Sequence, residues 1–451
     1  MTVVLRPETD LPDLPSPSSL VNVRIDDMIV DRRLKYPVYD TQGLLLLAGG
    51  TVITAEFKRH LKSREVSAVD IDYRDAENVT LSTDNLVEFG IPRDLSAFDT
   101  EVTKKLDKIV DAGLLFVQNR GPAVKESLVF HGRGAYAPKQ RANLLNRHRS
   151  SCESLDCMMR EVVQGGRVDG STIAGIAGSY LGSLTSDSDA LMSVAAEAKA
   201  DATLSNDSLK TALFGMAIGV EMGLDADNVR SIGLIGLVQN WGMIRVPREI
   251  RELNRKLTSV EFLEINKHPI YTLEMLESVS GFSGIVPLVA YQMHERVNGR
   301  GYPRGRRGYS IHLFARILQA ADAYTAMTER RSYRQPMMPY TAISALLSHT
   351  RIKTFDPTVI RALLKILSLF PIGSLVMLDD GRLATVMRRN GDNYVQPIVR
   401  ILQNADGNTL DPLDPDNIVN LEEANLRVRQ AIPMPGRNEL AEDVRPVPTC
   451  M

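Results

Sequence analysis

Apolar residues at helical spacing between Leu209 and Val220 constrain the fold of this chain more than any other feature of its sequence. They fall at i, i+3, i+4, i+7, i+8 and i+11 and so line one face of a helix: Leu209, Ala212, Leu213, Met216, Ala217 and Val220. Gly223 then predicts the end of this helix, and Asp225 can cap a second helix. Because that second helix contains the nearly all-apolar segment Ile232–Val238, we expect it at the centre of a helical bundle.

The signals remain helical from Leu155 to Leu369, and the period of the pattern changes after Pro371. Three segments beyond that proline predict strands separated by turns: Ser374–Leu378, Arg382–Arg388 and Tyr394–Leu402. Upstream, the short mixed elements between Val21 and Tyr73 predict a small α/β domain. The fold class that we expect is therefore mainly α, a helical bundle flanked by a small N-terminal α/β domain and a small C-terminal antiparallel β domain.

On these patterns the chain of 451 residues divides into six parts. They are a disordered lead-in (1–20), a small α/β domain (21–75), a helical and basic linker region (76–154), the helical domain (155–369), a small β domain (370–421) and a tail (422–451). Within the linker region, Asp99–Phe116 has helical spacing, and Arg120–Arg149 holds seven basic residues against Glu126 alone. That basic stretch is either a solvated loop or a surface for an acidic partner or a nucleotide.

Composition argues against several classes of protein. A formal net charge of −2 gives no overall attraction to DNA or to an anionic membrane. The longest apolar runs fall far short of the ~20 residues that span a bilayer, and the polar, proline-interrupted start has no apolar signal core. Cys152, Cys157 and Cys450 are too few for a disulfide framework. We therefore expect a cytoplasmic protein that has neither a membrane nor DNA as a partner.

Two motifs resemble those of a known family. The segment Ser231–Pro247 reads SIGLIGLVQNWGMIRVP, and Met293–Gly305 reads MHERVNGRGYPRG. Together they resemble the HD-GYP family, bacterial metal-dependent phosphodiesterases that open the second messenger cyclic di-GMP. In that family the first motif ends in HDIGK and the second reads HHExxDGxGYP, so Gln239 and Asn240 stand where a metal-binding His-Asp pair is expected. The resemblance implies an HD-superfamily helical bundle over roughly Leu191–Leu369.

The resemblance also implies where the other ligands of a metal centre fall. This sequence departs from the family pattern at five positions: Asp207, Gln239, Asn240, Met243 and Met293. It retains three of the family's metal ligands: His268, His294 and Asp322. At most these three remain to hold one divalent ion of Fe, Mn or Mg, with Asp207 or Glu295 as improvised additions.

The chemistry of the exchanged residues argues against a competent two-metal centre. Asn240 offers one neutral carbonyl oxygen in place of a bridging carboxylate, and Gln239 is a poor metal ligand compared with imidazole. Met293 carries a soft thioether and lies seven residues after Val286 on an apolar stripe, so core packing explains it.

Asp322 is the retained residue whose surroundings are easiest to predict. It lies four residues after Leu318 and eight after Phe314, which places a carboxylate on an apolar helix face. A buried, unpaired carboxylate is costly, so Asp322 needs a partner. We expect His268 or His294 to pair with it through an ion pair or a hydrogen bond, and a bound metal ion is the alternative.

The segment Asn298–Gly305 and its neighbours, called the arginine loop below (residues 296–307), form a second candidate site. Glycines permit a tight loop there, and arginines suit phosphate. By resemblance, this loop contributes to cyclic dinucleotide binding and to contacts with partner signalling domains. The candidate nucleotide-binding residues are Arg296, Arg300, Tyr302, Pro303 and Arg304. Glu295 is the only acid near this cluster in the sequence, and an ordinary solvated basic loop is the alternative.

Three functional hypotheses follow from the resemblance. The first is a degenerate HD-GYP-type signalling protein that binds cyclic di-GMP, or a partner such as a diguanylate-cyclase-type signalling domain, without efficient hydrolysis. The second is an active metal-dependent cyclic di-GMP phosphodiesterase rebuilt around His268, His294 and Asp322. The third is a protein-interaction scaffold that uses the arginine loop and has no nucleotide ligand.

Overall fold

The computed structural model describes residues 20–40, 44–64, 66–72, 75, 79, 98–113, 117–197, 203–255, 257–331, 334–351, 353–412, 414–434 and 436–437. The chain forms two compact units, residues 1–94 and 95–451, each with its own hydrophobic core. The expected lead-in, apart from Leu20, and the last part of the expected tail lie outside the described residues.

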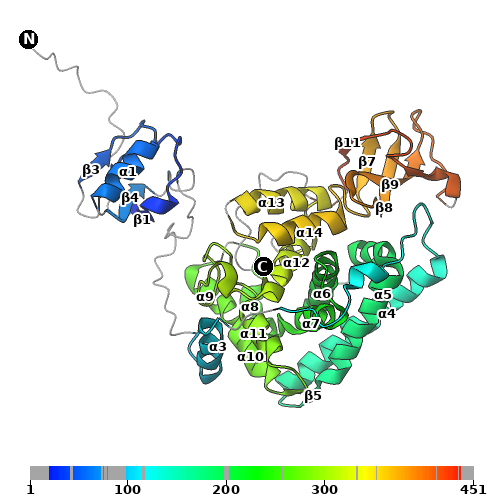
Figure 1. Ribbon diagram of the computed structural model, residues 1–451, viewed down its shortest axis with the longest axis horizontal. Coiled ribbons are helices and arrows are strands. Elements are labelled where there is room, and N and C mark those ends of the chain that lie inside the picture. Colours follow the sequence, from blue (N-terminus) through cyan, green and yellow to red (C-terminus); the bar gives the residue numbers. More distant parts are fainter. Residues whose placement is uncertain are drawn as a thin grey trace, which may run out of the picture. The chain divides into compact units, whose positions relative to one another are not determined.

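The N-terminal unit is a small α/β domain, as the sequence predicts (Figure 1). Its strands β1 (Leu20–Arg24), β2 (Val38–Tyr39), β3 (Leu45–Leu47) and β4 (Ala68–Asp72) pair antiparallel in the order β1-β4-β2-β3. Helix α1 (Ala55–Ser63) follows Thr54, whose hydroxyl accepts a hydrogen bond from Phe57 N–H and caps the helix. Its hydrophobic core consists of side chains from the strands, from α1 and from the segment before α1. They include Val23, Val38, Ile53, Leu61, Val69 and Ile71.

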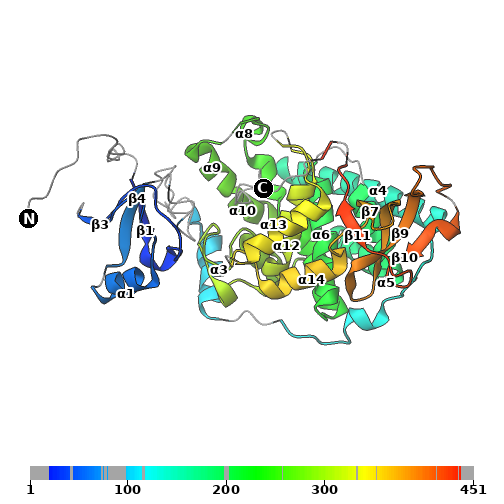
Figure 2. The same cartoon turned by 90° about the horizontal axis from the view of Figure 1, so that it is seen from above.

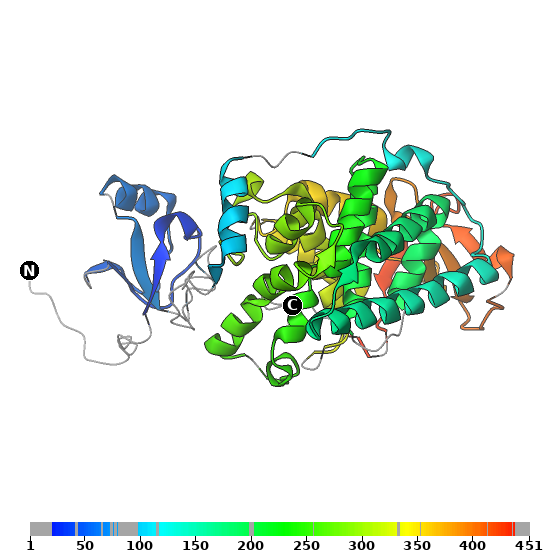
Figure 3. The same ribbon diagram turned by 90° about the horizontal axis from the view of Figure 1, so that it is seen from below.

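The larger unit is a helical bundle joined to a C-terminal sheet (Figures 1 and 3). Its α-helices are α3 (Glu101–Asp111), α4 (Pro138–Val163), α5 (Gly170–Glu197), α6 (Leu204–Glu221), α7 (Ala226–Val238), α8 (Arg248–Arg251), α9 (Ser259–Asn266), α10 (His268–Leu276), α11 (Ile285–Tyr291), α12 (Leu313–Thr328), α13 (Pro339–Arg351) and α14 (Pro357–Leu367). The 3-10 helix η5 (Trp241–Arg245) follows α7, and a short parallel pair joins β5 (Val168–Asp169) to β6 (Val279–Ser280). The mainly α fold class is confirmed.

Helices α6, α7 and α12 lie at the centre of this bundle. Residues 205–220 of α6 are all buried, and so is the segment Ile232–Val238 of α7 apart from Leu234. The two helices approach closely at Gly236, because a Cβ atom there would lie 2.6 Å from the Cα of Ala212. The predicted central position of the Ile232–Val238 helix is therefore confirmed.

The predicted boundary between these helices also agrees with the structure. Gly223 has a φ of +80°, in the left-handed region that glycine tolerates, and it follows the end of α6. The carboxylate of Asp225 accepts a hydrogen bond of 3.0 Å from Asn228 N–H and caps α7. The same carboxylate accepts from the backbone N–H of Arg120 and Gly121, which fixes the incoming chain beside α7.

The basic stretch Arg120–Arg149, which the sequence allows to be a solvated loop or a binding surface, is helical in its second part. Helix α4 begins at Pro138, a residue whose missing N–H costs nothing at the first helical position. The helix buries an apolar face made of widely spaced residues: Leu144, Cys152, Leu155, Met158, Met159 and Val162. The loop expectation is thus wrong from Pro138 onward, because the basic residues occupy the other faces of a long amphipathic helix.

The C-terminal part forms one antiparallel sheet (Figure 2). Strands β7 (Leu375–Leu378), β8 (Leu383–Asn390), β9 (Asn393–Gln403), β10 (Ile418–Asn420) and β11 (Val428–Ala431) lie in the order β10-β9-β8-β7-β11. Because β11 pairs with β7, the sheet runs past residue 421, where the sequence pattern placed its end.

A buried ion pair joins this sheet to the bundle. Arg388 of β8 donates from both terminal nitrogens to the carboxylate of Asp187 in α5, at 2.9 Å each. The guanidinium also lies over the ring of Tyr136, 4.4 Å from its centroid. The sheet therefore has a fixed position on the bundle. None of the helices described here is long and apolar enough to cross a membrane.

Candidate functional site

The end of α7 carries the two amide residues that replace the expected His-Asp pair. Gln239 is the C-cap residue directly after α7, and its carbonyl accepts a hydrogen bond of 3.1 Å from the Thr272 hydroxyl of α10. The same hydroxyl accepts from Gly242 N–H at 2.9 Å. At Gly242 a Cβ atom would lie 2.0 Å from the carbonyl oxygen of His268, so α10 and the turn after α7 touch through their backbones.

Asp322 of α12 is buried, with 6% of its surface exposed. One carboxylate oxygen accepts from Gln239 Nε2 at 3.5 Å and from Asn240 Nδ2 at 3.4 Å. Burial raises the pKa of Asp322 to about 6, against the positive charges of Arg296 and Arg331, which lower it. The predicted burial is confirmed, but the hydrogen-bonding partners are two amides rather than a histidine.

The two retained histidines pair with each other instead. His268 Nδ1 lies 2.8 Å from the carbonyl oxygen of Ile265, so this nitrogen carries the proton and donates. Nε2 of His268 is then an acceptor, and His294 Nε2, at 2.8 Å, donates to it. Burial lowers the pKa of His268 to about 4 and lowers that of His294 well below its ordinary value, where His268 and Arg296 add to the effect. Both rings are neutral at pH 7.

Tyr302 of the arginine loop packs directly on this histidine pair. Its ring is stacked on that of His294, with centroids 4.9 Å apart and planes at 2°. It meets the ring of His268 edge-on at 6.1 Å. The backbone N–H of Tyr302 donates to the carbonyl of His294 at 3.0 Å, so the loop is held at both the ring and the backbone.

The donors at this place do not fit the divalent centre that the resemblance implies. Each histidine uses its Nε2 atom on the other, and Asp322 faces two amide N–H groups that repel a cation. Within the described ranges, no group of three or more His, Cys, Asp or Glu side chains is arranged to hold a metal ion. Met293 is buried in the apolar core and Met243 lies in η5, so neither adds a suitable ligand.

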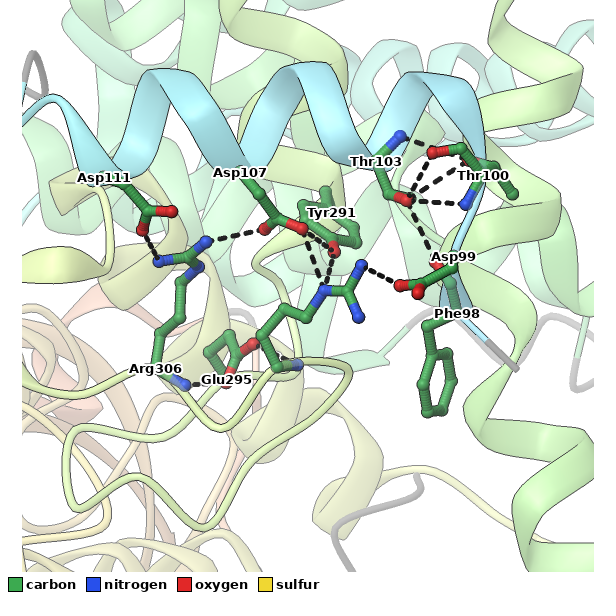
Figure 4. Close-up of polar contacts among 10 residues, drawn as sticks. Phe98, Asp99, Thr100, Thr103, Asp107, Asp111, Tyr291, Glu295 and Arg306 are labelled. Atoms are coloured by element: carbon green, nitrogen blue, oxygen red, sulfur yellow. Dashed lines mark hydrogen bonds and ion pairs between the residues drawn. The ribbon is translucent and has the colours of Figure 1, made fainter. Parts of the chain in front are cut away.

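The arginine loop is held by acids that come from a distant part of the sequence (Figure 4). Arg304 donates to Asp99 at 2.7 Å and to Asp107 of α3 at 2.9 Å. Arg306 donates to Asp107 at 2.6 Å and to Asp111 at 2.7 Å. Glu295 is therefore not the only acid near this cluster, because α3 supplies Asp107 and Asp111, and Asp99 lies just before that helix.

Glu295 binds two backbone N–H groups of the same loop. One carboxylate oxygen accepts from the backbone N–H of Arg304 and the other from that of Arg306, each at 2.7 Å (Figure 4). Tyr291 of α11 adds a hydroxyl that accepts from Arg304 Nε at 2.8 Å. Two backbone groups and two guanidinium groups of the loop are thus fixed by acids and a phenol.

The other candidate nucleotide-binding residues differ in exposure. Arg296 is buried, and its guanidinium lies 5.3 Å from the ring centroid of Phe355. Pro303 is buried, whereas Arg300 is half-buried and its backbone N–H donates to the side chain of Asn298. Arg300 and Arg304 are thus the two candidates that are not fully buried.

Several important residues escape sequence reasoning. Asp107 and Asp111 are four residues apart on one helical face, a visible acidic pattern, but nothing in the sequence says which cations it meets. Asp207 of α6, the position of the family's first histidine, forms an ion pair of 2.6 Å with Arg331. No sequence signal connects that pair.

Comparisons with known proteins agree with this architecture. A family model described as "HD domain" matches residues 191–359, from the end of α5 to α14. A cyclic di-GMP phosphodiesterase of Pseudomonas aeruginosa is 30% identical over 248 residues, 55% of this chain and 59% of that protein. The cyclic di-GMP phosphodiesterase PdeB of Borreliella burgdorferi is 26% identical over 50% of this chain and 59% of its own length. The 3′3′-cGAMP-specific phosphodiesterase 1 of Vibrio cholerae is 36% identical over 33% of this chain and 34% of its own length.

Residues 191–359 of the chain thus match an HD domain, and the chain is similar to cyclic di-GMP phosphodiesterases over about half of its length. It spans about three-fifths of the length of the first two of these relatives. The residues that match the HD domain include both motifs, the histidine pair, Asp322 and the whole arginine loop.

Proposed function

We propose that this chain is an HD-GYP-type signalling protein that binds cyclic di-GMP without efficient hydrolysis. The observation that carries the proposal is the hydrogen bonding of Asp322 to the amides of Gln239 and Asn240. In an HD-type phosphodiesterase, bound divalent cations would supply the attacking hydroxide and offset the charge of the phosphodiester. Here the amides supply neither imidazole nor a bridging carboxylate, so the residues left to act can bind and orient a ligand but cannot generate that nucleophile.

The arginine loop supports the binding half of this proposal. Arg300 is half-buried beside the well-fixed Tyr302, and a guanidinium is suited to bidentate contact with phosphate. Two of the relatives described above carry cyclic di-GMP in their names and a third carries 3′3′-cGAMP, which makes a cyclic dinucleotide the ligand class to test first.

Turnover is the first measurement. Purified protein with cyclic di-GMP and added Mn²⁺ or Fe²⁺ should give no linear dinucleotide or GMP above the no-protein control in a chromatographic assay. Metal-stimulated turnover that disappears in His294→Ala would contradict the proposal. It would favour the alternative of an active phosphodiesterase built around His268, His294 and Asp322.

Binding is the second measurement. Calorimetric titration should show saturable binding of cyclic di-GMP, and Arg300→Ala should weaken it by roughly 10–100-fold, the value of one charge-assisted hydrogen bond or two. Arg361→Ala is the matched control. Arg361 is exposed on α14, so this substitution removes the same positive charge at a position outside the arginine loop. Equal affinity of the two variants would remove the arginine loop from the nucleotide site.

A partner signalling domain is the second candidate ligand, and one observation favours it. Arg304 and Arg306 already bind the acidic face of a helix, α3, so their surface fits carboxylates presented by protein. A diguanylate-cyclase-type domain with an acidic helix would meet this requirement. Binding of such a domain in the absence of nucleotide, lost in Arg304→Ala, would support the partner or scaffold function over the nucleotide-binding one.

A further inference from the structure

A groove between α4 and α5 lies outside the site described above. The two helices lie side by side in the larger unit (Figure 1). The groove has a volume of about 420 Å³, which is within the usual range of small-molecule sites, ~300–1,000 Å³. Its polar walls come from the beginning of α4 and the middle of α5: Lys139, Gln140, Asn143, Arg147, Ser183 and Ser186. None of these residues belongs to the arginine loop or to the histidine pair.

Helix α4 contributes four polar side chains to the groove in a regular order. Lys139, Gln140, Asn143 and Arg147 fall at i, i+1, i+4 and i+8, which is one face of a helix. The rise of an α-helix places the first and the last of them roughly 12 Å apart along the axis. The order along the groove is therefore cation, amide, amide, cation.

Most donors on this face are unused within the part of the chain that the structure describes. The side chains of Lys139, Gln140 and Asn143 form no hydrogen bond or ion pair with any described residue. Arg147 donates from Nη1 to the hydroxyl of Ser183 at 2.8 Å, which holds the guanidinium against α5. Its Nη2 has no such partner among the described residues. An incoming acceptor would therefore meet free N–H groups on both sides of the two amides.

The acids near the groove do not balance its cations. Residues 138–150, the first half of α4, contain no Asp or Glu, and neither do the groove walls. Asp187 and Asp189 follow the groove on α5, but two arginines of β8 already bind them. Arg388 donates to Asp187 at 2.9 Å, and Arg389 donates to Asp189 at 2.6 Å. The groove thus combines positive charge with hydrogen-bond donors.

We propose that this groove binds an anion that carries several charges along its length, namely a chain of two or three phosphoryl groups, as in an oligophosphate or a nucleoside polyphosphate. Arg147 offers a planar fork of N–H groups to one phosphoryl group, and Lys139 offers a compact charge to another. The amides of Gln140 and Asn143 donate to oxygens between them. A single carboxylate is a poorer match, because it cannot reach cations that far apart.

This inference goes beyond the proposed function, because it concerns a different ligand on different helices. Calorimetric titration of the full chain with inorganic phosphate, pyrophosphate and triphosphate tests it. The titrations contain a chelator and about 150 mM salt, which screens exposed charges more than ~8 Å apart. Affinity should rise from phosphate to pyrophosphate to triphosphate, and triphosphate should bind with a stoichiometry of one per chain.

Two substitutions on α4 separate a built site from a basic surface. Lys139→Ala should weaken triphosphate binding by roughly 10-fold, the value of one hydrogen bond to a charged group. Arg149→Ala is the matched control, because Arg149 is exposed on the same half of α4 but outside the groove. It should change the affinity by less than about twofold. Both residues are exposed, so both variants should keep the melting temperature of the wild type within about 1 °C.

Four results would overturn the proposal. They are no binding of triphosphate, equal affinity for the three phosphates, an equal loss in Lys139→Ala and Arg149→Ala, and binding of a poly-glutamate peptide without binding of triphosphate. The last result would assign the groove to an acidic protein partner. Arg300→Ala distinguishes this site from the arginine loop, because triphosphate should bind this variant as it binds the wild type. A loss of triphosphate binding in Arg300→Ala would place the phosphate chain in the arginine loop and would also overturn the proposal.

Discussion

Gly301 brings the arginine loop against the histidine pair at the distance of backbone contact. A Cβ atom at this position would lie 2.2 Å from the carbonyl oxygen of His294 and 2.3 Å from the Cα of Glu295. Neither atom belongs to a flexible side chain, so the loop cannot accept a larger residue without moving. The stacking of Tyr302 on His294 depends on this close approach.

Substitution of Gly301 by alanine should therefore destabilise the protein. We expect a loss of roughly 1–3 kcal/mol in the free energy of unfolding, the usual cost of overpacking, measured by chemical denaturation. Gly284→Ala is the control, because a Cβ atom there meets nothing within 4 Å and Gly284, directly before α11, has helical backbone angles that alanine adopts without strain. Equal free energies for the two variants would show that the loop is not pressed against His294.

Residue chemistry explains which part of the site could be predicted. The apolar spacing around Asp322 predicts its burial, because helical period alone places a side chain on a face. The choice of partner depends on three-dimensional positions: His268 and His294 bond each other at 2.8 Å, and the hydrogen bonds to the Asp322 carboxylate come from the amides of Gln239 and Asn240. The predicted histidine partner is wrong for this reason.

Helix α3 is the element that fixes the arginine loop. Its apolar face packs on α10 and α11 through Leu106, Val110 and their buried neighbours, and its acidic face meets the loop. Asp107 is the central residue, because it bonds both Arg304 and Arg306 and its side chain is only 18% exposed.

Asp107→Asn should loosen the loop without unfolding the bundle. We expect a loss of roughly 1–3 kcal/mol, between the values for exposed and buried ion pairs, together with faster amide hydrogen exchange in residues 299–308. Glu101→Gln removes a charge from the same helix where the side chain is 83% exposed, so it should leave both quantities unchanged. Unchanged exchange in Asp107→Asn would mean that the loop keeps its conformation without α3.

Local spacing predicts that α3 is a helix but not what it contacts. The capping threonines and the apolar positions of Asp99–Phe116 are local signals, and α3 indeed spans Glu101–Asp111. Its partners Arg304 and Arg306 lie almost two hundred residues away, as 197 and 199 residues separate them from Asp107. No periodicity carries information over that distance.

At the scale of the whole larger unit, the C-terminal sheet is attached to the bundle through Arg388 and Asp187. Both side chains are almost fully buried, at 3% and 4% exposure. Burial raises the pKa of Asp187, but hydrogen bonds from Arg388 and from Ala190 N–H together bring it below the ordinary value. The alternation of apolar and polar residues predicts strands in this part of the chain. It does not predict β11, because β11 pairs with β7, a strand that lies far before it in the sequence.

The pH dependence of stability follows from the sign of this shift. A carboxyl with a lowered folded-state pKa contributes stability that is fully present above its ordinary pKa of 3.8 and is lost as the pH falls through the lower folded value. Arg388→Met should cost roughly 3–5 kcal/mol at pH 7, and its difference from the wild type should shrink below about pH 4. Arg382→Met, whose partner Asp380 is 34% exposed, should cost less than about 1 kcal/mol at any pH. A constant difference between Arg388→Met and wild type from pH 7 to pH 3 would refute the role of this pair.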